Sequence, residues 1–171
     1  EEPIQWTKLK SLDIIEVDLR RDLPGIFTSM LSLESVYISH TEMSTQSQKH
    51  LFDAPELKEL TLSDCEMGPI PNEIGNLKKL EKLIINVDQA VVNDQIKTIP
   101  PEIGEFNVLK TLNLNHCGLK SLPSEIQNLS KSLEKLYLVG NSFDEASREQ
   151  IQEWLPNTDI YFWTHDIYLS T

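Results

Sequence analysis

One short phrase recurs along this chain at a nearly constant spacing. It has the form L-x-x-L-x-L, in which a leucine is followed three and five residues later by further apolar residues. The steps between successive copies are 24, 24, 23, 29 and 24 residues. A period of about 20–29 residues is typical of a solenoid, in which each unit buries its apolar side only against its neighbours. The six copies begin at Leu9, Leu33, Leu57, Leu80, Leu109 and Leu133.

The phrase predicts a β-strand in each repeat. Counting from the first leucine, the residues at positions 4 and 6 are apolar and alternate with more polar ones, as in a strand with one buried face. Equivalent strands of successive repeats would stack in parallel, about 4.8 Å apart. We therefore expect residues 57–62, 80–85, 109–114 and 133–138 to be neighbouring strands. Their position-4 residues should point inward: Leu60, Leu83, Leu112 and Leu136.

A second phrase follows the strand in repeats three to five. It reads I/L-P-x-E-I and begins at Ile70, Ile99 and Leu122, with a further apolar residue three positions after its end. Spacings of four and three turn one face of a helix inward, and proline supplies the fixed φ of a first turn. Repeat two replaces the phrase with a polar segment anchored by Leu51 and Phe52, which we also interpret as a helical turn.

The two phrases together strongly resemble the leucine-rich repeat family. The form I/L-P-x-E-I-G/Q-x-L is similar to the short bacterial and plant-like subtypes of that family, and the resemblance extends over roughly residues 9–143. It implies an α/β solenoid, which is a right-handed coil with a concave parallel β-sheet and short convex helical or 3-10 turns. It also implies a recognition module that binds a protein partner.

The two ends of the chain depart from the repeat. Ser142 and Glu145 have the spacing of a capping box, which predicts a helix from Asp144 to about Leu155. The aromatic segment 159–163 then predicts a seventh strand. The expected organisation is an N-terminal cap at 1–8, six repeats at 9–141, a C-terminal helix–strand cap at 142–163 and a tail at 164–171.

Composition and missing motifs exclude several classes of function. The chain has 27 acidic and 15 basic residues, and its formal net charge of −12 argues against nucleic acid or an anionic membrane as partner. No apolar run approaches the roughly 18 residues of a membrane span. Motifs such as H-E-x-x-H, G-x-S-x-G and G-K-[ST] are missing from the sequence. We expect no enzymatic activity and no cofactor, and a monomer rather than an oligomer.

Both cysteines occupy position 9 of their repeats. Cys65 and Cys117 would lie two rungs apart, about 10 Å by the strand spacing, whereas a disulfide needs Cα atoms within about 7 Å. We therefore predict two buried free thiols. The resemblance adds that this position holds an inward side chain that bonds the backbone of neighbouring loops.

The exposed positions of the sheet supply the candidate partner-binding residues. Tyrosine and other apolar side chains occur there although the repeat does not require them, and tyrosine often anchors protein interfaces. Single apolar residues on a surface are also normal, so incidental exposure is the alternative. The candidates are Tyr37, Thr61, Ile84, Asn113 and Tyr137 at position 5, Asn86 at position 7 and His116 at position 8. Ile15 and Val139 are further apolar residues at position 7.

Position 8 also contains a possible set of metal ligands. Glu16, His40 and Asp64 should stand on three successive rungs, and histidine with carboxylates suits zinc or another divalent ion. A hydrogen-bonded column of charges is the alternative, since solenoids readily place like residues in columns. Metal-assisted binding or assembly is therefore the weakest of the functional hypotheses.

The 29-residue step inserts a loop at residues 88–98. Insertions of this kind map to one face of a solenoid and often carry recognition, although a tolerated loop is the alternative. The even repeats and the ending Ser142 to Phe162 resemble bacterial exported repeat proteins, which implies a secreted or cell-surface protein. The rival hypothesis is a cytoplasmic scaffold resembling the Ras-associated repeat proteins, where free thiols would be at home.

Overall fold

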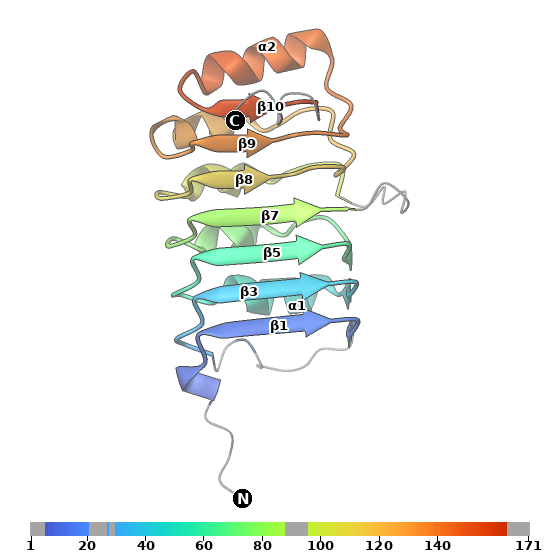
Figure 1. The fold of residues 1–171 in the computed structure, drawn as a ribbon, viewed down its shortest axis with the longest axis vertical. Helices are drawn as coiled ribbons and strands as arrows, with labels where there is room; N and C mark the ends of the chain where they lie inside the picture. The colour runs from blue at the N-terminus through green and yellow to red at the C-terminus, as the bar shows by residue number, and fades with distance from the viewer. Residues whose placement is uncertain (1–5, 21–26, 28–29, 88–95, 164–171) are drawn as a thin grey trace, which may run out of the picture.

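A computed structural model describes residues 6–20, 27, 30–87 and 96–163 of the chain. Seven parallel strands form one sheet, and their order in the sheet is their order in the sequence (Figure 1). The predicted parallel, neighbouring arrangement of the repeat strands is confirmed, and a seventh strand follows the sixth as expected. The strands are β1 (Ser11–Ile15), β3 (Ser35–Ser39), β5 (Glu59–Ser63), β7 (Lys82–Asn86), β8 (Thr111–Asn113), β9 (Lys135–Tyr137) and β10 (Asp159–Tyr161).

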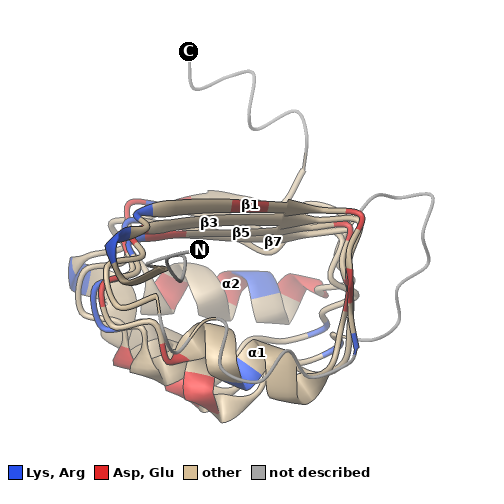
Figure 2. Cartoon of the chain, turned by 90° about the horizontal axis from the view of Figure 1, so that it is seen from below, with Lys and Arg blue, Asp and Glu red and all other residues tan. Residues whose placement is uncertain are grey.

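Short helices form the convex side of the coil, opposite the sheet (Figure 2). The I/L-P-x-E-I phrase gives 3-10 turns with the proline as N-cap or just inside, and its isoleucines and the following apolar residues are buried. The polar segment of repeat two is an α-helix, and Leu51 and Phe52 are fully buried as predicted. The convex elements are α1 (Thr45–Phe52), η2 (Asn72–Asn76), η3 (Pro101–Glu105) and η4 (Ser124–Lys131).

A second, smaller sheet of three parallel strands runs along the edge where the strands of the first three repeats end. Its strands are β2 (Asp18–Leu19), β4 (Glu42–Met43) and β6 (Glu66–Met67). Of the predicted N-terminal cap, the structure describes only the 3-10 turn η1 (Trp6–Lys8). Residues 1–5, the tail at 164–171 and most of the predicted loop, residues 88–95, lie outside the described residues.

The register of the main sheet places like positions of successive repeats side by side. Val36, Leu60 and Leu83 are Cα partners in one column, and Leu112 and Leu136 continue it. All four predicted inward leucines are 0% exposed, so the register from the sequence is confirmed. The position-6 residues form a second buried column beside the first.

The C-terminal end is closed by α2 (Glu145–Trp154), which lies beyond β10 in Figure 1. The predicted capping box is wrong, because Ser142 is not the N-cap. Asp144 is the N-cap, and its carboxylate accepts a hydrogen bond from the amide of Ser147 at 2.8 Å. A carboxylate is also the better partner for the positive end of a helix dipole, and the Ser147 contact lowers the pKa of Asp144.

Side chains at position 9 donate hydrogen bonds to backbone carbonyls of the preceding coil. The Cys65 thiol donates to the carbonyl of Ile38 at 3.4 Å, and the Cys117 thiol donates to that of Ile85 at 3.2 Å. Asn141 does the same for Leu114 at 2.7 Å. Both cysteines are buried and free, as predicted. Burial raises the pKa of Cys65 to about 11 and that of Cys117 to about 12.

Position 8 is a corner of the backbone. In five of the six repeats its residue adopts a left-handed conformation with φ between 50° and 73°, which favours glycine, and Val87 of the fourth repeat is the exception. Only Gly140 meets that preference, and its missing side chain serves a second purpose, since a methyl group at 140 would overlap the imidazole ring of His116. The corner residues are Glu16, His40, Asp64, His116 and Gly140.

Replacing Leu112 by alanine should lower the free energy of unfolding by roughly 2–5 kcal/mol, because a fully buried leucine leaves a cavity between two neighbouring coils. Urea denaturation followed by circular dichroism measures the change. Thr111→Ala, at a half-exposed neighbour, is the control and should cost far less. A loss below about 1 kcal/mol for Leu112→Ala would contradict the packing described above.

The two thiols should react slowly with a thiol reagent at neutral pH until the protein is denatured. Only a thiolate attacks such a reagent, and burial keeps both side chains protonated and inaccessible. Counting labelled thiols by mass spectrometry before and after adding denaturant gives the result. Fast labelling of the native protein at both positions would show that position 9 does not point inward.

Gly140→Ala should destabilise the protein more than Gly118→Ala. Both glycines have positive φ, but no atom lies within 4 Å of a Cβ placed at position 118. Backbone strain alone should therefore cost about 1 kcal/mol at 118, and the clash with His116 should add about 1–3 kcal/mol at 140. Equal changes in melting temperature for the two variants would mean that His116 moves away at no cost.

Candidate functional site

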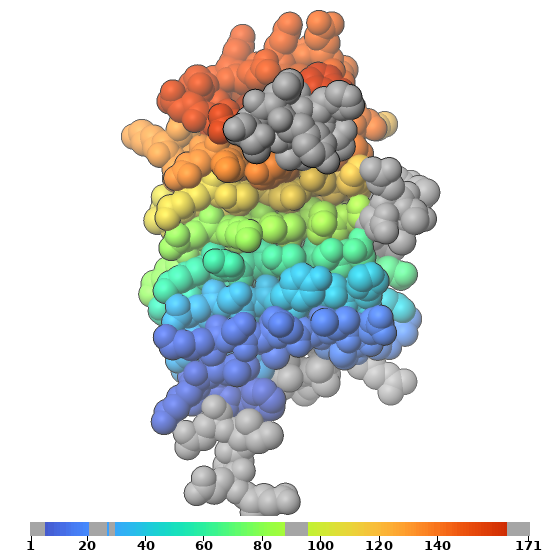
Figure 3. Space-filling model, in the orientation of Figure 1, coloured from blue at the N-terminus to red at the C-terminus, as the bar shows by residue number. Residues whose placement is uncertain are grey.

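The concave sheet presents side chains of seven parallel strands on one face, and Figure 3 shows its repeats as stacked bands. Positions 5 and 7 of the six repeats carry a single charged residue, Asp13. Figure 2 shows the same contrast, with the strands almost uncoloured and the charges along the sheet edges and on the convex turns. A protein with a net charge of −12 thus keeps the middle of one face nearly free of charge.

The predicted position-5 residues form one column across the sheet. The Cα pairing runs from Asp13 through Tyr37 and Thr61 to Ile84, and continues through Asn113 to Tyr137. Tyr37 is 38% exposed, and Thr61, Ile84, Asn113 and Tyr137 are half-buried. The register therefore brings these five predicted site residues together.

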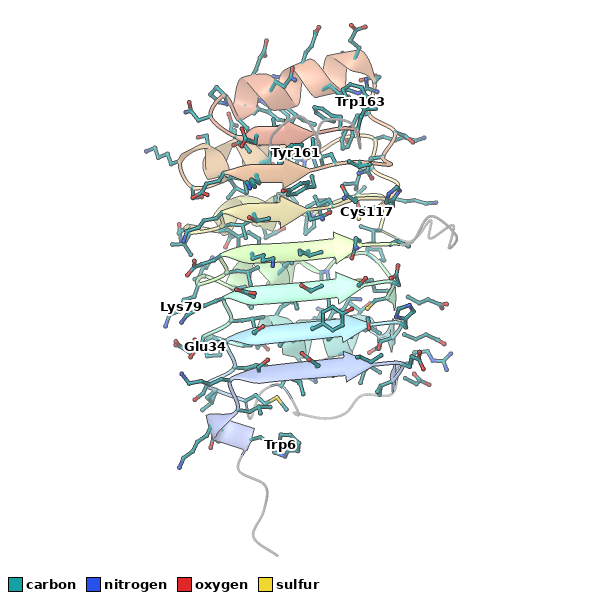
Figure 4. The ribbon with its side chains drawn as sticks, in the orientation of Figure 1. Trp6, Glu34, Lys79, Cys117, Tyr161 and Trp163 are labelled. Atoms are coloured by element: carbon teal, nitrogen blue, oxygen red, sulfur yellow. The ribbon has the colours of Figure 1, made fainter. Side chains whose placement is uncertain are left out.

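The side chain of Tyr137 is less available to a partner than the sequence suggests. Its ring stacks on that of Tyr161 in the next strand, with ring centroids 4.7 Å apart and an interplanar angle of 11°. Tyr161 itself is buried, and Figure 4 shows it on the sheet near the C-terminal end. Tyr37 is consequently the most accessible aromatic residue of the column, whereas Tyr137 also contributes to the fold.

Position 7 turns partly inward, which the sequence did not predict. Val139 is buried, so its expected exposure is wrong, and Ser39 is buried as well. Ile15 in the first repeat remains exposed. The strands of the main sheet end at or before this position, and the corner at position 8 follows it.

Amide side chains continue the strand ladder at this point. Asn115 Oδ1 accepts a hydrogen bond from the amide of Val139 at 2.8 Å, and Asn113 Oδ1 accepts one from the amide of Asn115 at 3.0 Å. Asn86, a predicted site residue on the neighbouring rung, is half-buried, and its Oδ1 has no hydrogen-bond partner among the described residues. The same oxygen is shielded from solvent, so it is a buried acceptor without a hydrogen bond and not an accessible contact for a partner.

The position-8 residues do not form a metal site. His40 Nε2 lies 4.0 Å from Asp64 Oδ2, and Glu16 does not complete a set of three. Across the described part of the chain, no group of three His, Cys, Asp or Glu residues is arranged to hold a metal ion. The left-handed corner explains the column, because it places one side chain of each coil at the same edge. His116 is half-buried at this edge, two coils beyond Asp64.

A column of alternating charges follows the edge where the strands begin, and it was not predicted although position 2 of the repeat shows it in the sequence. Position 2 holds lysine and glutamate in strict alternation over six repeats. Glu34 Oε1 lies 2.8 Å from Lys10 Nζ and its Oε2 lies 2.7 Å from Lys58 Nζ, and these bonds lower the pKa of Glu34 to about 2. Glu34 is labelled on this edge in Figure 4. The column is Lys10, Glu34, Lys58, Glu81, Lys110 and Glu134.

The comparisons with known proteins agree with this geometry. The Leucine Rich Repeat family profile matches residues 56–77 and 108–129. The probable serine/threonine-protein kinase pats1 of Dictyostelium discoideum is 35% identical over 138 residues, which is 80% of this chain and 4% of the kinase. The volume-regulated anion channel subunit LRRC8B of Homo sapiens is 27% identical over 134 residues, or 77% of this chain and 16% of the subunit. The chain thus spans a small part of these curated relatives.

Solved structures show the same fold. A leucine-rich repeat protein of Leptospira interrogans has a TM-score of 0.62 and 25% identity, over 83% of this chain and 40% of that chain. An internalin of Listeria monocytogenes has a TM-score of 0.70 and 20% identity, over 92% of this chain and 42% of that chain. None of the described helices is long and apolar enough to cross a membrane. With its stacked parallel strands, its convex turns and these matches, the chain is a leucine-rich repeat protein.

Proposed function

We propose that this chain is a recognition module that binds a protein partner through its concave sheet. The observation that carries the proposal is the nearly uncharged strip formed by positions 5 and 7 on a strongly acidic protein. The centre of a protein interface is depleted of charged residues and enriched in aromatic ones. The family suggests protein–protein interaction in general, and the strip indicates where on this chain a partner would bind.

Three residues of position 5 are suited to anchor such a partner. Tyr37, Ile84 and Tyr137 occupy one column, separated by the smaller Thr61 and Asn113. The short side chains between the anchors leave room for groups of a partner to approach the backbone of the sheet. Asn86, two residues after Ile84 on the same strand, remains a proposed contact through the accessible part of its half-buried side chain.

The loop at 88–98 is the second part of the proposed surface. The structure describes only its last three residues, where Ile96 is buried and Lys97 has a left-handed backbone conformation. Ile96 therefore fixes the point at which the loop rejoins the coil. The loop follows Val87, beside the Asn86 edge of the strip, so a partner on the sheet would meet it there.

Binding without catalysis is also part of the proposal. Proteins with this fold are generally recognition modules. The Dictyostelium relative is a probable kinase, but this chain spans 4% of it, and a kinase activity is not carried over to the repeats. Cytoplasmic and exported proteins share the fold, so the compartment needs its own evidence.

We keep a secreted or cell-surface location as the favoured proposal, supported by the resemblance of the repeat phrase and of the chain ending to bacterial exported proteins. The eukaryotic curated relatives and the two free thiols support the cytoplasmic scaffold instead. Fractionation of the source cells with an antibody against the purified chain separates the two, because only an exported protein is found outside the cytoplasmic fraction.

Tyr37→Ala should weaken partner binding by about 2 kcal/mol or more, roughly thirtyfold in Kd, because it removes the most exposed anchor of the strip. The partner is first isolated by affinity capture on the immobilised chain, and Kd is then measured by calorimetry. The melting temperature should barely change. Ile84→Ala and Tyr137→Ala should weaken binding too, and Tyr137→Ala should also lower the melting temperature because its stacking on Tyr161 is lost.

Glu125→Ala on the convex turn η4 is the matched control and should leave both Kd and melting temperature unchanged. A partner that tolerates all three concave changes but fails with Glu125→Ala binds the opposite face. A parallel loss of stability and binding in Tyr37→Ala would show instead that Tyr37 holds the fold.

A further inference from the structure

A cavity of about 260 Å³ lies between the last convex turn and the C-terminal helix. One wall comes from Ser121 and Leu122, which lead into η4, and the other comes from α2 and its N-cap. All of the lining residues belong to the continuous described segment 96–163. The two walls are held together, since α2 packs against η4 and Ile151 belongs to the hydrophobic core.

The cavity has an apolar floor and a polar rim. Leu122 and Ile151 are buried, and the half-buried ring of Trp154 packs against the core. Ser121 and Gln150, which also line the cavity, are exposed. A binding site commonly combines an apolar lining with a few polar groups that fix the orientation of what binds.

The cavity and Trp163, the last described residue, lie on opposite sides of α2. The guanidinium carbon of Arg148 lies 4.6 Å from the centroid of the Trp163 ring. Residues two apart on a helix are separated by about 200°, so Ala146 and Gln150 are on the side opposite Arg148. Both of them line the cavity, which is therefore formed without the ring of Trp163.

Asp144 is the only charged residue of the lining. Its carboxylate accepts the N-cap hydrogen bond from Ser147, and it has no ion-pair partner among the described residues. Arg148, the only basic residue of α2, is held elsewhere, because its Nη2 donates to the carbonyl of Phe143 at 2.7 Å. The negative charge at the rim is thus available to a cation from outside.

The surroundings of the cavity are acidic as well. Glu145, Glu149 and Glu153 are exposed on α2 and do not line the cavity. Lys120, which precedes Ser121, is an exposed cation on the opposite wall, and the carboxylates of the helix outnumber it. The electrostatic field at the rim therefore favours a positively charged group.

We propose that this cavity binds a segment of a protein partner in which a large apolar side chain stands next to a lysine or arginine. The apolar side chain would fill the cavity against Leu122, Ile151 and Trp154, and the cation would lie at the rim beside Asp144. An aromatic ring is favoured, because it gains an offset-stacked or edge-to-face contact with Trp154. This site is separate from the concave strip and would add a second contact surface beside a convex turn.

A protein segment fits the cavity better than a free small molecule does. Small-molecule sites commonly have volumes of about 300–1,000 Å³ and enclose most of the ligand. At about 260 Å³ and with exposed residues on its rim, this cavity has room for one large side chain and leaves the rest of a ligand outside. Backbone groups of a bound segment would then meet Ser121 and Gln150, whose side chains both donate and accept hydrogen bonds.

The first test is an NMR titration of the full isotope-labelled chain with the peptide acetyl-Gly-Gly-Phe-Lys-Gly-Gly-amide. Amide shifts should saturate and should be confined to residues 121–122 and 144–154. Two matched peptides separate the two parts of the site. Glutamate in place of the lysine should weaken binding about fivefold, because attraction becomes repulsion, and alanine in place of the phenylalanine should weaken it about tenfold or more.

A charge variant gives a second measurement. Asp144→Asn keeps an oxygen that caps the helix but removes the charge, so the melting temperature should stay close to that of the wild type. It should weaken binding of the lysine peptide about twofold to fivefold and abolish the preference over the glutamate peptide. Glu145→Gln, which removes the same charge from the neighbouring residue outside the lining, is the matched control and should change the affinity less than about twofold.

A filling variant tests the cavity itself. Ala146 is exposed, and leucine is a good helix former, so Ala146→Leu should fold normally. Its side chain would occupy the cavity and should weaken peptide binding about tenfold or more. Gln152→Leu adds a leucine to the same helix outside the cavity and should leave the affinity unchanged.

Three results would overturn the proposal. The first is a titration without saturable shifts at residues 121–122 and 144–154. The second is equal affinity for the lysine and glutamate peptides, or an Asp144→Asn variant that binds as the wild type does. The third is phenethylamine bound as tightly as the lysine peptide, which would make the cavity a site for a free amine. None of these substitutions lies on the concave sheet, so the results leave the proposed function to be tested by itself.

Discussion

The described coils of this protein bury their leucines against neighbouring coils rather than in separate cores. The in-register parallel pairing of the strands makes this possible, since it aligns position 4 with position 4 and position 6 with position 6 across the sheet. A slip by one residue would turn every leucine toward solvent. The concave surface, the corners and the convex turns all inherit their positions from this one alignment.

Two sets of polar interactions support the strand register outside the buried leucine columns. Inside the turns, the position-9 side chains donate hydrogen bonds to backbone carbonyls of their own coil or of the preceding one: Thr41, Cys65, Cys117 and Asn141. Outside, the lysine–glutamate column contributes little per exposed ion pair, but displacement by one whole repeat would oppose like charges along the edge. The hydrophobic columns supply most of the stability, and the charges help to specify which repeat follows which.

Much of this fold could be predicted from the sequence, because the same pattern of apolar residues occurs in every repeat and each copy supports the same register. The strands, the inward leucines, the position-9 thiols and the position-5 column all follow from the periodicity. The wrong predictions concern single residues whose structure depends on their local surroundings and not on the repeat. Ser142 and Glu145 have the spacing of a capping box, yet the helix begins at Glu145 and Asp144 is its N-cap. Val139 is buried although its place in the repeat predicts an exposed side chain.

The part of the candidate site that follows from the repeat could also be predicted from the sequence. The register brought Tyr37, Thr61, Ile84, Asn113 and Tyr137 together because a column is a property of the repeat. The stacking of Tyr137 on Tyr161 depends on the last strand, which lies outside the repeat phrase. The Glu16, His40 and Asp64 column was real as a column but misleading as chemistry, because left-handed corner geometry sets the direction of its side chains.

The C-terminal helix affects the order in which the described coils open. In a stack stabilised by nearest neighbours, opening begins where one neighbour is missing and the remaining contacts are weakest. α2 supplies a neighbour for the last coil, since Ile151 is buried and Arg148 lies over the ring of Phe162. Backbone amides of β9 and β10 should therefore be among the last of the described residues to lose protection against hydrogen exchange. Truncating the chain before α2 would remove that neighbour, and the coils in front of it should then lose their protection one after another.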